Sequence, residues 1–285
     1  MKHMKSILQI AVASFVFMQF NAQAESLKNS QIGLQLYSLR NQFQTNVPAT
    51  LNLVKNFGVC SVELAGTYNR SPEEFRTDLA ARGLNAISGH FAFERFRDDP
   101  EGVVREAKIL GLKYAGCAWI PHTGVFDEKS ARGAAAVFNH AGQVLAKNGL
   151  KFFYHTHGYE FQPFQDGTLF DVFVRDTNPK FVNFEMDVFW VVQPGQNPVK
   201  LLETYGSRWC LMHVKGMRDN TPTGLLTGSS DVTNDVAVGT GKINYLPILD
   251  AGKKAGVKFF FIEDESPSSV QQIPQSLDFL HAAKW

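Results

Sequence analysis

The chain has 285 residues, a length that suits one large α/β domain or two ordinary domains and allows a sizeable core. Hydrophobic residues make up 44% and charged residues 19%, the composition of a globular protein rather than of a disordered or membrane-embedded one. The formal net charge of +1 provides no overall field for nucleic acid or an anionic membrane, so partners must be inferred from a local site.

The first 24 residues predict a signal peptide. Lys2 and Lys5 precede an apolar run over residues 7–20, and Ala22-Gln23-Ala24 follows it. A basic start, a short apolar stretch and a small-x-small end are typical of secretory signals. We therefore expect export, to the periplasm, with cleavage after Ala24 and no stable membrane anchor afterwards. An uncleaved anchor or a lipid-free membrane tether is the alternative.

From residue 25 onward, eight apolar runs alternate with eight amphipathic segments. The runs are rich in Phe, Val and Ile and lack regular polar alternation, as expected of parallel strands covered on both faces. They span Ile32–Leu39, Cys60–Ala65, Leu84–Gly89, Tyr114–Ile120, Leu150–His157, Phe181–Asp187, Cys210–Val214 and Val257–Glu263. The helical patterns span Pro48–Phe57, Pro72–Arg82, Pro100–Leu110, Glu128–Lys147, Leu169–Thr177, Pro198–Tyr205, Tyr245–Lys254 and Ser269–His281.

Glycines at the ends of these helical patterns indicate how the units connect. Several helices end in glycine directly before the next strand, as at Gly58, Gly83 and Gly111. Such short junctions favour right-handed crossovers, and eight βα units predict a single (β/α)8 TIM barrel of the α/β class over residues 25–285. The alternative is a doubly wound open sheet. It fits less well because Ser38-Leu39-Arg40 follows the first strand, where a Gly-rich phosphate turn would stand.

Residues 216–241 interrupt this rhythm with a long polar stretch. It is too long and irregular for an ordinary βα loop. On a barrel it would lie over the catalytic face, so we expect a lid or substrate-specificity loop, with a disordered decoration as the alternative.

The three cysteines do not indicate a disulfide framework. Cys60, Cys117 and Cys210 are an odd number spread along the chain, each in or beside an apolar run. We expect them to be small core residues.

Polar side chains end the last four predicted strands: His155 and His157, then Asp187, His213 and Glu263. The carboxyl ends of barrel strands meet on one face, where active sites are built. Burying such groups is costly unless they are paired or coordinate a metal. The sequence therefore predicts one divalent ion. The predicted ligands are His155, Asp187, His213 and Glu263, and these nitrogen and oxygen donors suit Mn, Co, Fe, Ni, Zn or Mg.

The identity of the first ligand is open between His155 and Glu160. Strand alternation puts His155 and His157 on the same side, so that one can ligate while the other does acid–base work. We prefer His155 as the ligand because it lies deeper in the strand, and Glu160 is the alternative. Glu185 is expected one layer deeper than Asp187, in a structural or supporting role.

Six segments at the strand ends resemble the sugar phosphate isomerase/epimerase family, which has the xylose isomerase-like TIM barrel. They are Gln35–Arg40, Val62–Gly66, Tyr154–Phe161, Glu185–Val191, Leu211–Lys215 and Ile262–Glu265. The resemblance covers essentially the whole chain after residue 24. It implies a metal bound by Glu, Asp, His and Glu, of which Asp187, His213 and Glu263 match the last three. His155 stands where the first Glu is usual, which is more similar to the branch of inosose dehydratase-like proteins and exported 3-keto-glycoside lyases.

The resemblance also implies a chemistry, proton abstraction next to a carbonyl that the metal polarises. It implies His157 or Glu160 as the base and Lys215 as a cation for the oxyanion or a hydroxyl. Glu63, His90 and Trp190 would contact the sugar. Proton return to the other carbon gives isomerisation or epimerisation, whereas loss of a β-substituent gives elimination.

The expected function is therefore a metal-dependent sugar isomerase or epimerase. Export favours a small carbohydrate substrate without phosphate, either a free sugar or a keto-glycoside. One alternative is a 3-keto-glycoside lyase or dehydratase, and another is a non-enzymatic sugar-binding barrel. Phosphodiester hydrolysis, as in the related endonuclease IV barrels, is disfavoured because the chain has no basic, aromatic-interleaved stripe for nucleic acid. A homo-oligomer is compatible with the sequence.

Overall fold

Eight parallel strands close into a barrel in the computed structural model, which describes residues 31–284. The strands are β1 (Ile32–Gln35), β2 (Ser61–Leu64), β3 (Asn85–His90), β4 (Tyr114–Cys117), β5 (Lys151–His155), β8 (Val182–Asp187), β9 (Trp209–Val214) and β12 (Phe259–Ile262). Their order around the barrel is β1-β12-β9-β8-β5-β4-β3-β2, and β1 pairs in parallel with both β12 and β2. The predicted barrel is thus confirmed, and the open sheet is excluded.

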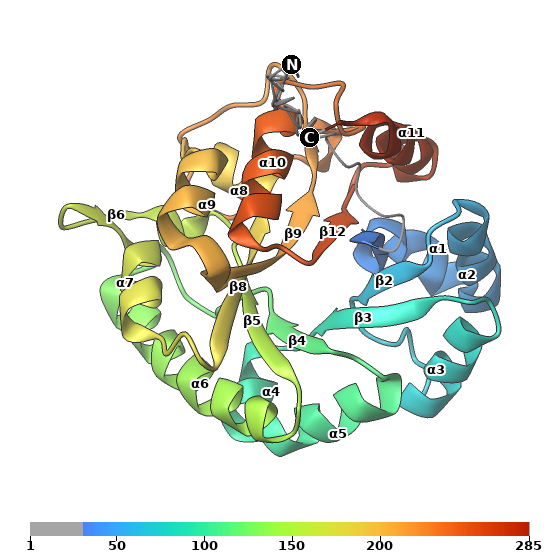
Figure 1. Cartoon of the computed structure of the whole chain (residues 1–285), viewed down its shortest axis with the longest axis horizontal. Helices are drawn as coiled ribbons and strands as arrows, with labels where there is room; N and C mark the ends of the chain where they lie inside the picture. Colours follow the sequence, from blue (N-terminus) through green and yellow to red (C-terminus); the bar gives the residue numbers. More distant parts are fainter. Residues whose placement is uncertain (1–30, 285) are drawn as a thin grey trace, which may run out of the picture.

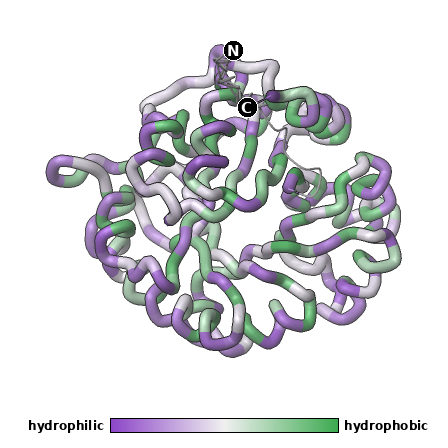
Figure 2. The backbone as a smooth tube through the Cα atoms, in the orientation of Figure 1, coloured by the Kyte–Doolittle hydropathy of each residue, from purple (hydrophilic) through white to green (hydrophobic). Residues whose placement is uncertain are grey.

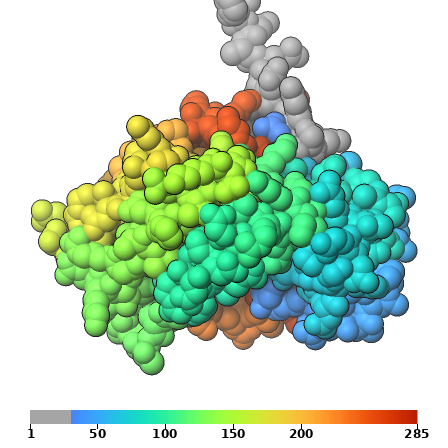
Figure 3. Space-filling model, turned by 90° about the horizontal axis from the view of Figure 1, so that it is seen from below, coloured from blue at the N-terminus to red at the C-terminus, as the bar shows by residue number. Residues whose placement is uncertain are grey.

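The helices form a ring outside the strands (Figure 1). They are α1 (Arg40–Thr45), α2 (Val47–Asn56), α3 (Pro72–Ala80), α4 (Phe93–Asp98), α5 (Pro100–Leu110), α6 (Glu128–Lys147), α7 (Leu169–Asp176), α8 (Val188–Val192), α9 (Pro198–Tyr205), α10 (Tyr245–Ala255) and α11 (Ser269–Ala282). Figure 2 shows hydrophilic and hydrophobic residues alternating along this ring, as amphipathic helices require. Seen from below in Figure 3, the helices of residues 72–147 form one continuous outer layer.

Local signals explain why several predicted helices match closely. The spans of α5, α6 and α9 coincide with the predicted ones. Ser71 caps α3 in a reciprocal capping box with Glu74, and a proline opens the helix. A different signal ends α5, whose C-terminal cap is Gly111 in the left-handed conformation, with φ of 79°.

Several strands are shorter than predicted, and the differences in two of them bear on the site. β1 ends at Gln35 because residues Leu36–Leu39 form the 3-10 helix η2, whose first turn is capped by the Gln35 side chain. β5 ends at His155, so His157 lies beyond the strand and the alternation argument for the two histidines was wrong. Their rings are nevertheless neighbours, with centroids 5.6 Å apart.

Other predictions need correction too. The short helices α1, α4 and α8 were not predicted. Cys117 and Cys210 are buried as expected, but Cys60 is exposed, because it precedes β2 instead of lying within it. All three are free thiols.

Residues 216–241 have defined structure over the strand ends. β10 (Gly216–Met217) pairs antiparallel with β11 (Asp235–Val236), and the 3-10 helix η5 (Val232–Asn234) leads into β11. A second hairpin, β6 (Pro163–Phe164) with β7 (Gly167–Thr168), precedes α7. The role of residues 216–241 as a lid stays a prediction.

The predicted signal peptide, residues 1–24, lies outside the described residues. Within residues 31–284, no helix is both long and apolar enough to cross a membrane.

Large aromatic rings and glycines together fill the barrel interior. Phe153 and Phe261 are fully buried in a cluster inside the strands. A Cβ on Gly116 would lie 2.3 Å from the Phe153 ring. A Cβ on Gly33 would lie 2.6 Å from the Phe261 ring and 2.8 Å from the Ser61 carbonyl oxygen. The two glycines therefore make room for the rings, as dense interior packing demands.

Replacing Gly33 by alanine should destabilise the barrel, since a backbone oxygen in the way cannot move as a side chain can. We expect a loss of roughly 1–3 kcal/mol in the free energy of unfolding, measured by chemical denaturation. The control is Gly133→Ala on α6, where a Cβ meets nothing within 4 Å. It should be neutral or stabilising by roughly 0.5–1 kcal/mol. Equal stability of the two variants would contradict this account of the interior.

Candidate metal centre

The predicted ligands meet below a cavity of about 530 Å³ at the carboxyl ends of the strands. His155, His157, Lys215 and Glu263 line this cavity, together with His90. Residues 228–230, which belong to the long segment 216–241, form part of its wall.

Asp187, His213 and Glu263 form what we call the upper cluster. They come from the end of β8, from β9 and from the residue after β12. One nitrogen or oxygen of each lies within 4.8 Å of the others. His213 Nδ1 is 3.3 Å from Glu263 Oε2 and 3.8 Å from Asp187 Oδ2. All three side chains are buried, so three of the four predicted ligands lie together.

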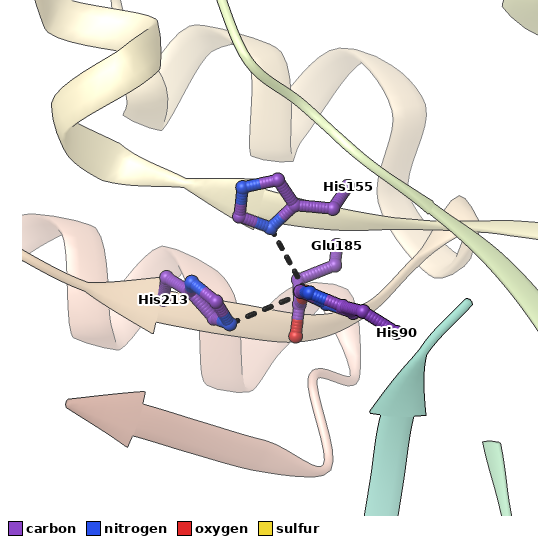
Figure 4. A group of neighbouring side chains, drawn as sticks. All are labelled: His90, His155, Glu185 and His213. Atoms are coloured by element: carbon purple, nitrogen blue, oxygen red, sulfur yellow. Dashed lines mark hydrogen bonds and ion pairs between the residues drawn. The ribbon is translucent and has the colours of Figure 1, made fainter. Parts of the chain in front are cut away.

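The lower cluster consists of His90, His155, Glu185 and His213, with the three imidazoles gathered around the carboxylate (Figure 4). Glu185 Oε2 lies 3.0 Å from His155 Nδ1, 3.2 Å from His90 Nε2 and 3.3 Å from His213 Nε2. His213 therefore belongs to both clusters through its two ring nitrogens. Glu185, expected only in a supporting role, is a donor that could also hold a cation.

Glu63 lies deeper than its predicted role as a sugar contact requires. It is fully buried and does not line the cavity. Its carboxylate accepts from Gln35 Nε2 at 2.8 Å and Ser88 Oγ at 2.5 Å, and lies 2.5 Å from His213 Nε2. Burial alone would raise the pKa of Glu63, but His90 and His213 outweigh it and hold that pKa well below its usual range. An ionised Glu63 can thus keep the proton of His213 on Nε2 and leave Nδ1 free to ligate.

The donors of the upper cluster fit a divalent cation. Asp187 Oδ1 accepts from the Trp190 backbone N–H, whereas Oδ2 is buried with no hydrogen-bond partner among the described residues. Despite burial, neighbouring carboxylates raise the pKa of His213 well above its usual range. The surroundings therefore attract positive charge, which a cation would supply in place of a proton.

His155 and Glu160, the two candidates for the first ligand, lie in different places. His155 Nε2 is 3.9 Å from Asp187 Oδ2, beside the upper cluster. Glu160 belongs to neither cluster and does not line the cavity. It accepts from the His157 backbone N–H at 2.8 Å, and burial raises its pKa to about 8. The geometry thus favours His155 as the residue next to the ion.

His157 and Trp190 form a stacked pair at the cavity. Their ring centroids are 4.8 Å apart with the planes inclined by 20°. Burial and the charge of Lys215 lower the pKa of His157 to about 3, so the imidazole is neutral. Its Nδ1 has no hydrogen-bond partner among the described residues. Trp190, the predicted sugar platform, is only 5% exposed, and its ring supports His157.

Lys215 is buried among three carboxylates. Its Nζ lies 2.5 Å from Glu265 Oε1, 3.5 Å from Glu263 Oε2 and 3.6 Å from Asp235 Oδ2. Burial would lower the pKa of Lys215, but these carboxylates raise it well above its usual value. The ammonium group is therefore charged at the edge of the cavity.

Several residues that line the cavity were not predicted as site residues. Among them are Asp235, Glu265, Tyr37 and Trp119. Glu265 stands just after a predicted strand, and Tyr37 and Trp119 lie near the carboxyl ends of two others, which was a usable signal. Asp235 comes from residues 216–241, and no local pattern marks it.

Replacing Lys215 by methionine should leave three carboxylates, two of them buried, without their cation. We expect a loss of roughly 3–5 kcal/mol in the free energy of unfolding of the metal-free protein, measured by denaturant titration. The control is Lys254→Met, whose exposed pairing with Asp250 should matter little. A Lys215 variant as stable as this control would show that the buried charges are compensated in another way.

Comparisons with known proteins agree with this fold. The family model described as xylose isomerase-like TIM barrel matches residues 51–283. No match was found among curated proteins. A sugar phosphate isomerase/epimerase from Parabacteroides distasonis ATCC 8503 is 23% identical, with a TM-score of 0.74 over 90% of this chain and 95% of that one.

Two other similar structures have lower identity. The IOLI protein with a bound zinc atom is 14% identical, with a TM-score of 0.71 over 90% of this chain and 99% of that one. The probable 3-DHS dehydratase AsbF from Bacillus anthracis is 13% identical, with a TM-score of 0.68 over 88% and 98%. At such identities these likenesses show the fold, whereas the family model covers most of the sequence. The chain belongs to the xylose isomerase-like TIM barrel family.

Proposed function

We propose that this protein is a divalent-metal-dependent carbohydrate enzyme that abstracts a proton next to a carbonyl, as a sugar isomerase or epimerase does. The observation that carries the proposal is the upper cluster. Asp187, His213 and Glu263 are buried, and Asp187 Oδ2 has no hydrogen-bond partner among the described residues, next to a cavity that His157 and Lys215 line. Ligands, a candidate base and a candidate cation thus meet at one place.

Asp187, His213 and Glu263 would hold the ion, with His155 beside them. A divalent cation bound there supplies Lewis-acid polarisation of a substrate carbonyl. The zinc atom in the IOLI protein, which has the same fold, supports a metal in this kind of barrel.

His157 is the base in this proposal. His157 lines the cavity, its Nδ1 is buried without a hydrogen-bond partner among the described residues, and stacking on Trp190 fixes the plane of its neutral ring. The imidazole takes a proton from the carbon next to the carbonyl, and the electron pair of the broken C–H bond moves to the carbonyl oxygen. The Lys215 ammonium is placed to donate a hydrogen bond to that oxygen or a neighbouring hydroxyl.

The intermediate can react in two ways. Return of the proton to the other carbon completes an isomerisation, and return to the opposite face of the same carbon an epimerisation. Departure of a β-substituent gives elimination instead, the reaction of a lyase or dehydratase. The probable dehydratase AsbF has the same barrel fold, which supports keeping elimination as the second candidate.

The charges of the cavity favour a substrate without phosphate. Among the described residues that line it, Lys215 is the single Lys or Arg, and three carboxylates already surround it. A phosphate dianion would find no uncompensated side-chain cation there. We therefore propose a free sugar or a keto-glycoside.

Export to the periplasm is part of the proposal and follows from residues 1–24 of the sequence. Mass spectrometry of the protein from a periplasmic fraction should find a chain that begins at Glu25. A full-length chain retained in the membrane would support the uncleaved anchor instead.

The metal content of the purified protein tests the ligand set. We expect about one divalent ion per chain by elemental analysis, lost in His213→Ala because this imidazole contributes to both clusters. His140→Ala, on the exposed side of α6, is the matched control and should keep the ion. A metal-free wild-type protein would favour the non-enzymatic sugar-binding alternative.

Solvent deuterium reports proton abstraction directly. Metal-loaded wild type should incorporate deuterium into a ketose or a 3-keto-glycoside, followed by NMR. His157→Gln should slow exchange by about 10²–10⁴-fold while the metal stays bound. Glu160→Gln should retain exchange, since Glu160 does not line the cavity. Loss in Glu160→Gln but not in His157→Gln would assign the base to Glu160, and no exchange with any carbohydrate would argue against the enzyme.

A further inference from the structure

We propose that the mouth of the cavity is a second binding site, which holds the aglycone of a glycoside by stacking on Trp119 and Tyr37. The inference rests on the proposed function, because it places the reacting sugar at the charged floor of the same cavity. It narrows the substrate to molecules with two ring systems.

Exposed apolar side chains in the described structure point to this place. Residues 31–284 expose five large hydrophobic side chains: Tyr37, Trp119, Val125, Leu225 and Leu246. The two aromatic ones are each 42% exposed, and both line the cavity, whereas the three aliphatic ones do not. Both exposed aromatic rings among these five side chains therefore lie at the cavity. This placement indicates a ligand-binding surface instead of incomplete burial.

Trp119 is held rigidly despite its exposure. It stacks on His122 with ring centroids 5.2 Å apart and planes inclined by 23°. The His157 ring lies perpendicular to it, also with centroids 5.2 Å apart. His122 Nδ1 is in turn fixed at 2.7 Å from the Ile120 carbonyl oxygen. One face of the indole is thus backed, while much of the ring remains open to a ligand.

The tip of the 216–241 segment adds to the support of Trp119. Gly228 has a φ of 65°, and a Cβ there would lie 3.2 Å from Trp119 Cζ3 and 2.7 Å from the Tyr159 ring. The backbone therefore approaches the indole as closely as a glycine permits. Ser229 and Ser230, next along this tip, line the cavity and offer hydroxyls to a sugar.

The ring of Tyr37 is also supported on one face. The guanidinium of Arg40 lies over its ring at 4.4 Å. Arg40 is itself held by the Glu265 carbonyl oxygen at 3.2 Å and by the Glu265 carboxylate at 3.5 Å. This phenol ring is therefore also supported on one face by a fixed charged group.

The cavity thus has two chemically distinct parts. The imidazoles, carboxylates and Lys215 that line it are largely buried, and we call them its floor, whereas the two aromatic rings are exposed and mark its mouth. A volume of about 530 Å³ falls within the range of about 300–1,000 Å³ typical of pockets for drug-sized ligands, more room than one sugar ring needs. The face of an aryl ring and the C–H face of a second sugar both stack on an aromatic surface, so both kinds of aglycone share the required chemistry.

Calorimetric binding of unreactive glycosides to the metal-loaded protein tests the proposal. The probes are methyl β-D-glucopyranoside, phenyl β-D-glucopyranoside and the disaccharide methyl β-cellobioside, none of which has a free anomeric carbon. We expect the phenyl glycoside, the cellobioside or both to bind at least about tenfold more tightly than methyl β-D-glucopyranoside. The probe with the larger preference identifies the aglycone as aryl or sugar.

Trp119→Ala should reduce this preference to within about twofold, and Trp119→Phe should keep part of it because a ring remains. Leu246→Ala removes an equally exposed side chain away from the cavity and should change nothing. Equal affinity for all three probes, no measurable binding of any, or a preference that survives in both Trp119→Ala and Tyr37→Ala would overturn the proposal. The probes cannot react, so this failure is distinct from an absence of deuterium exchange.

Discussion

His213 lies between four carboxylates in the interior of the barrel, and the rest of the site depends on how this buried charge is compensated. Its Nε2 faces Glu63 and Glu185, and its Nδ1 faces Asp187 and Glu263. Buried carboxylates are costly unless they are paired or bind a cation. The barrel brings these groups together from β2, β8, β9 and the end of β12, so the fold itself creates the demand for positive charge.

The surrounding residues meet only part of that demand. Gln35 and Ser88 supply hydrogen bonds to Glu63, and Lys215 is already shared among three carboxylates. Asp187 Oδ2 has no hydrogen-bond partner among the described residues. A divalent ion in the upper cluster would complete the balance and polarise a carbonyl in the cavity above. In the proposed reaction this leaves His157, which is not one of the four carboxylates or their cations, as the group that moves a proton.

Much of the fold could be predicted from short-range signals. Caps, prolines and glycine stops give helix ends that depend on a few neighbouring residues, and α5, α6 and α9 match accordingly. Asp187, His213 and Glu263 could be brought together because ends of parallel strands must meet at one face. Depth was harder to predict. A strand pattern does not distinguish a carboxylate that faces the cavity from one beneath it, as Glu63 is. The contact of Asp235 with Lys215 depends on how residues 216–241 fold back, which no local pattern encodes.

The position of the ion tests the central claim most directly. Anomalous diffraction from crystals of the protein loaded with Mn²⁺ or Zn²⁺ would locate it. The account predicts one peak in contact with Asp187, His213 and Glu263. A peak surrounded by His90, His155 and Glu185 instead, or no peak within the barrel, would contradict it.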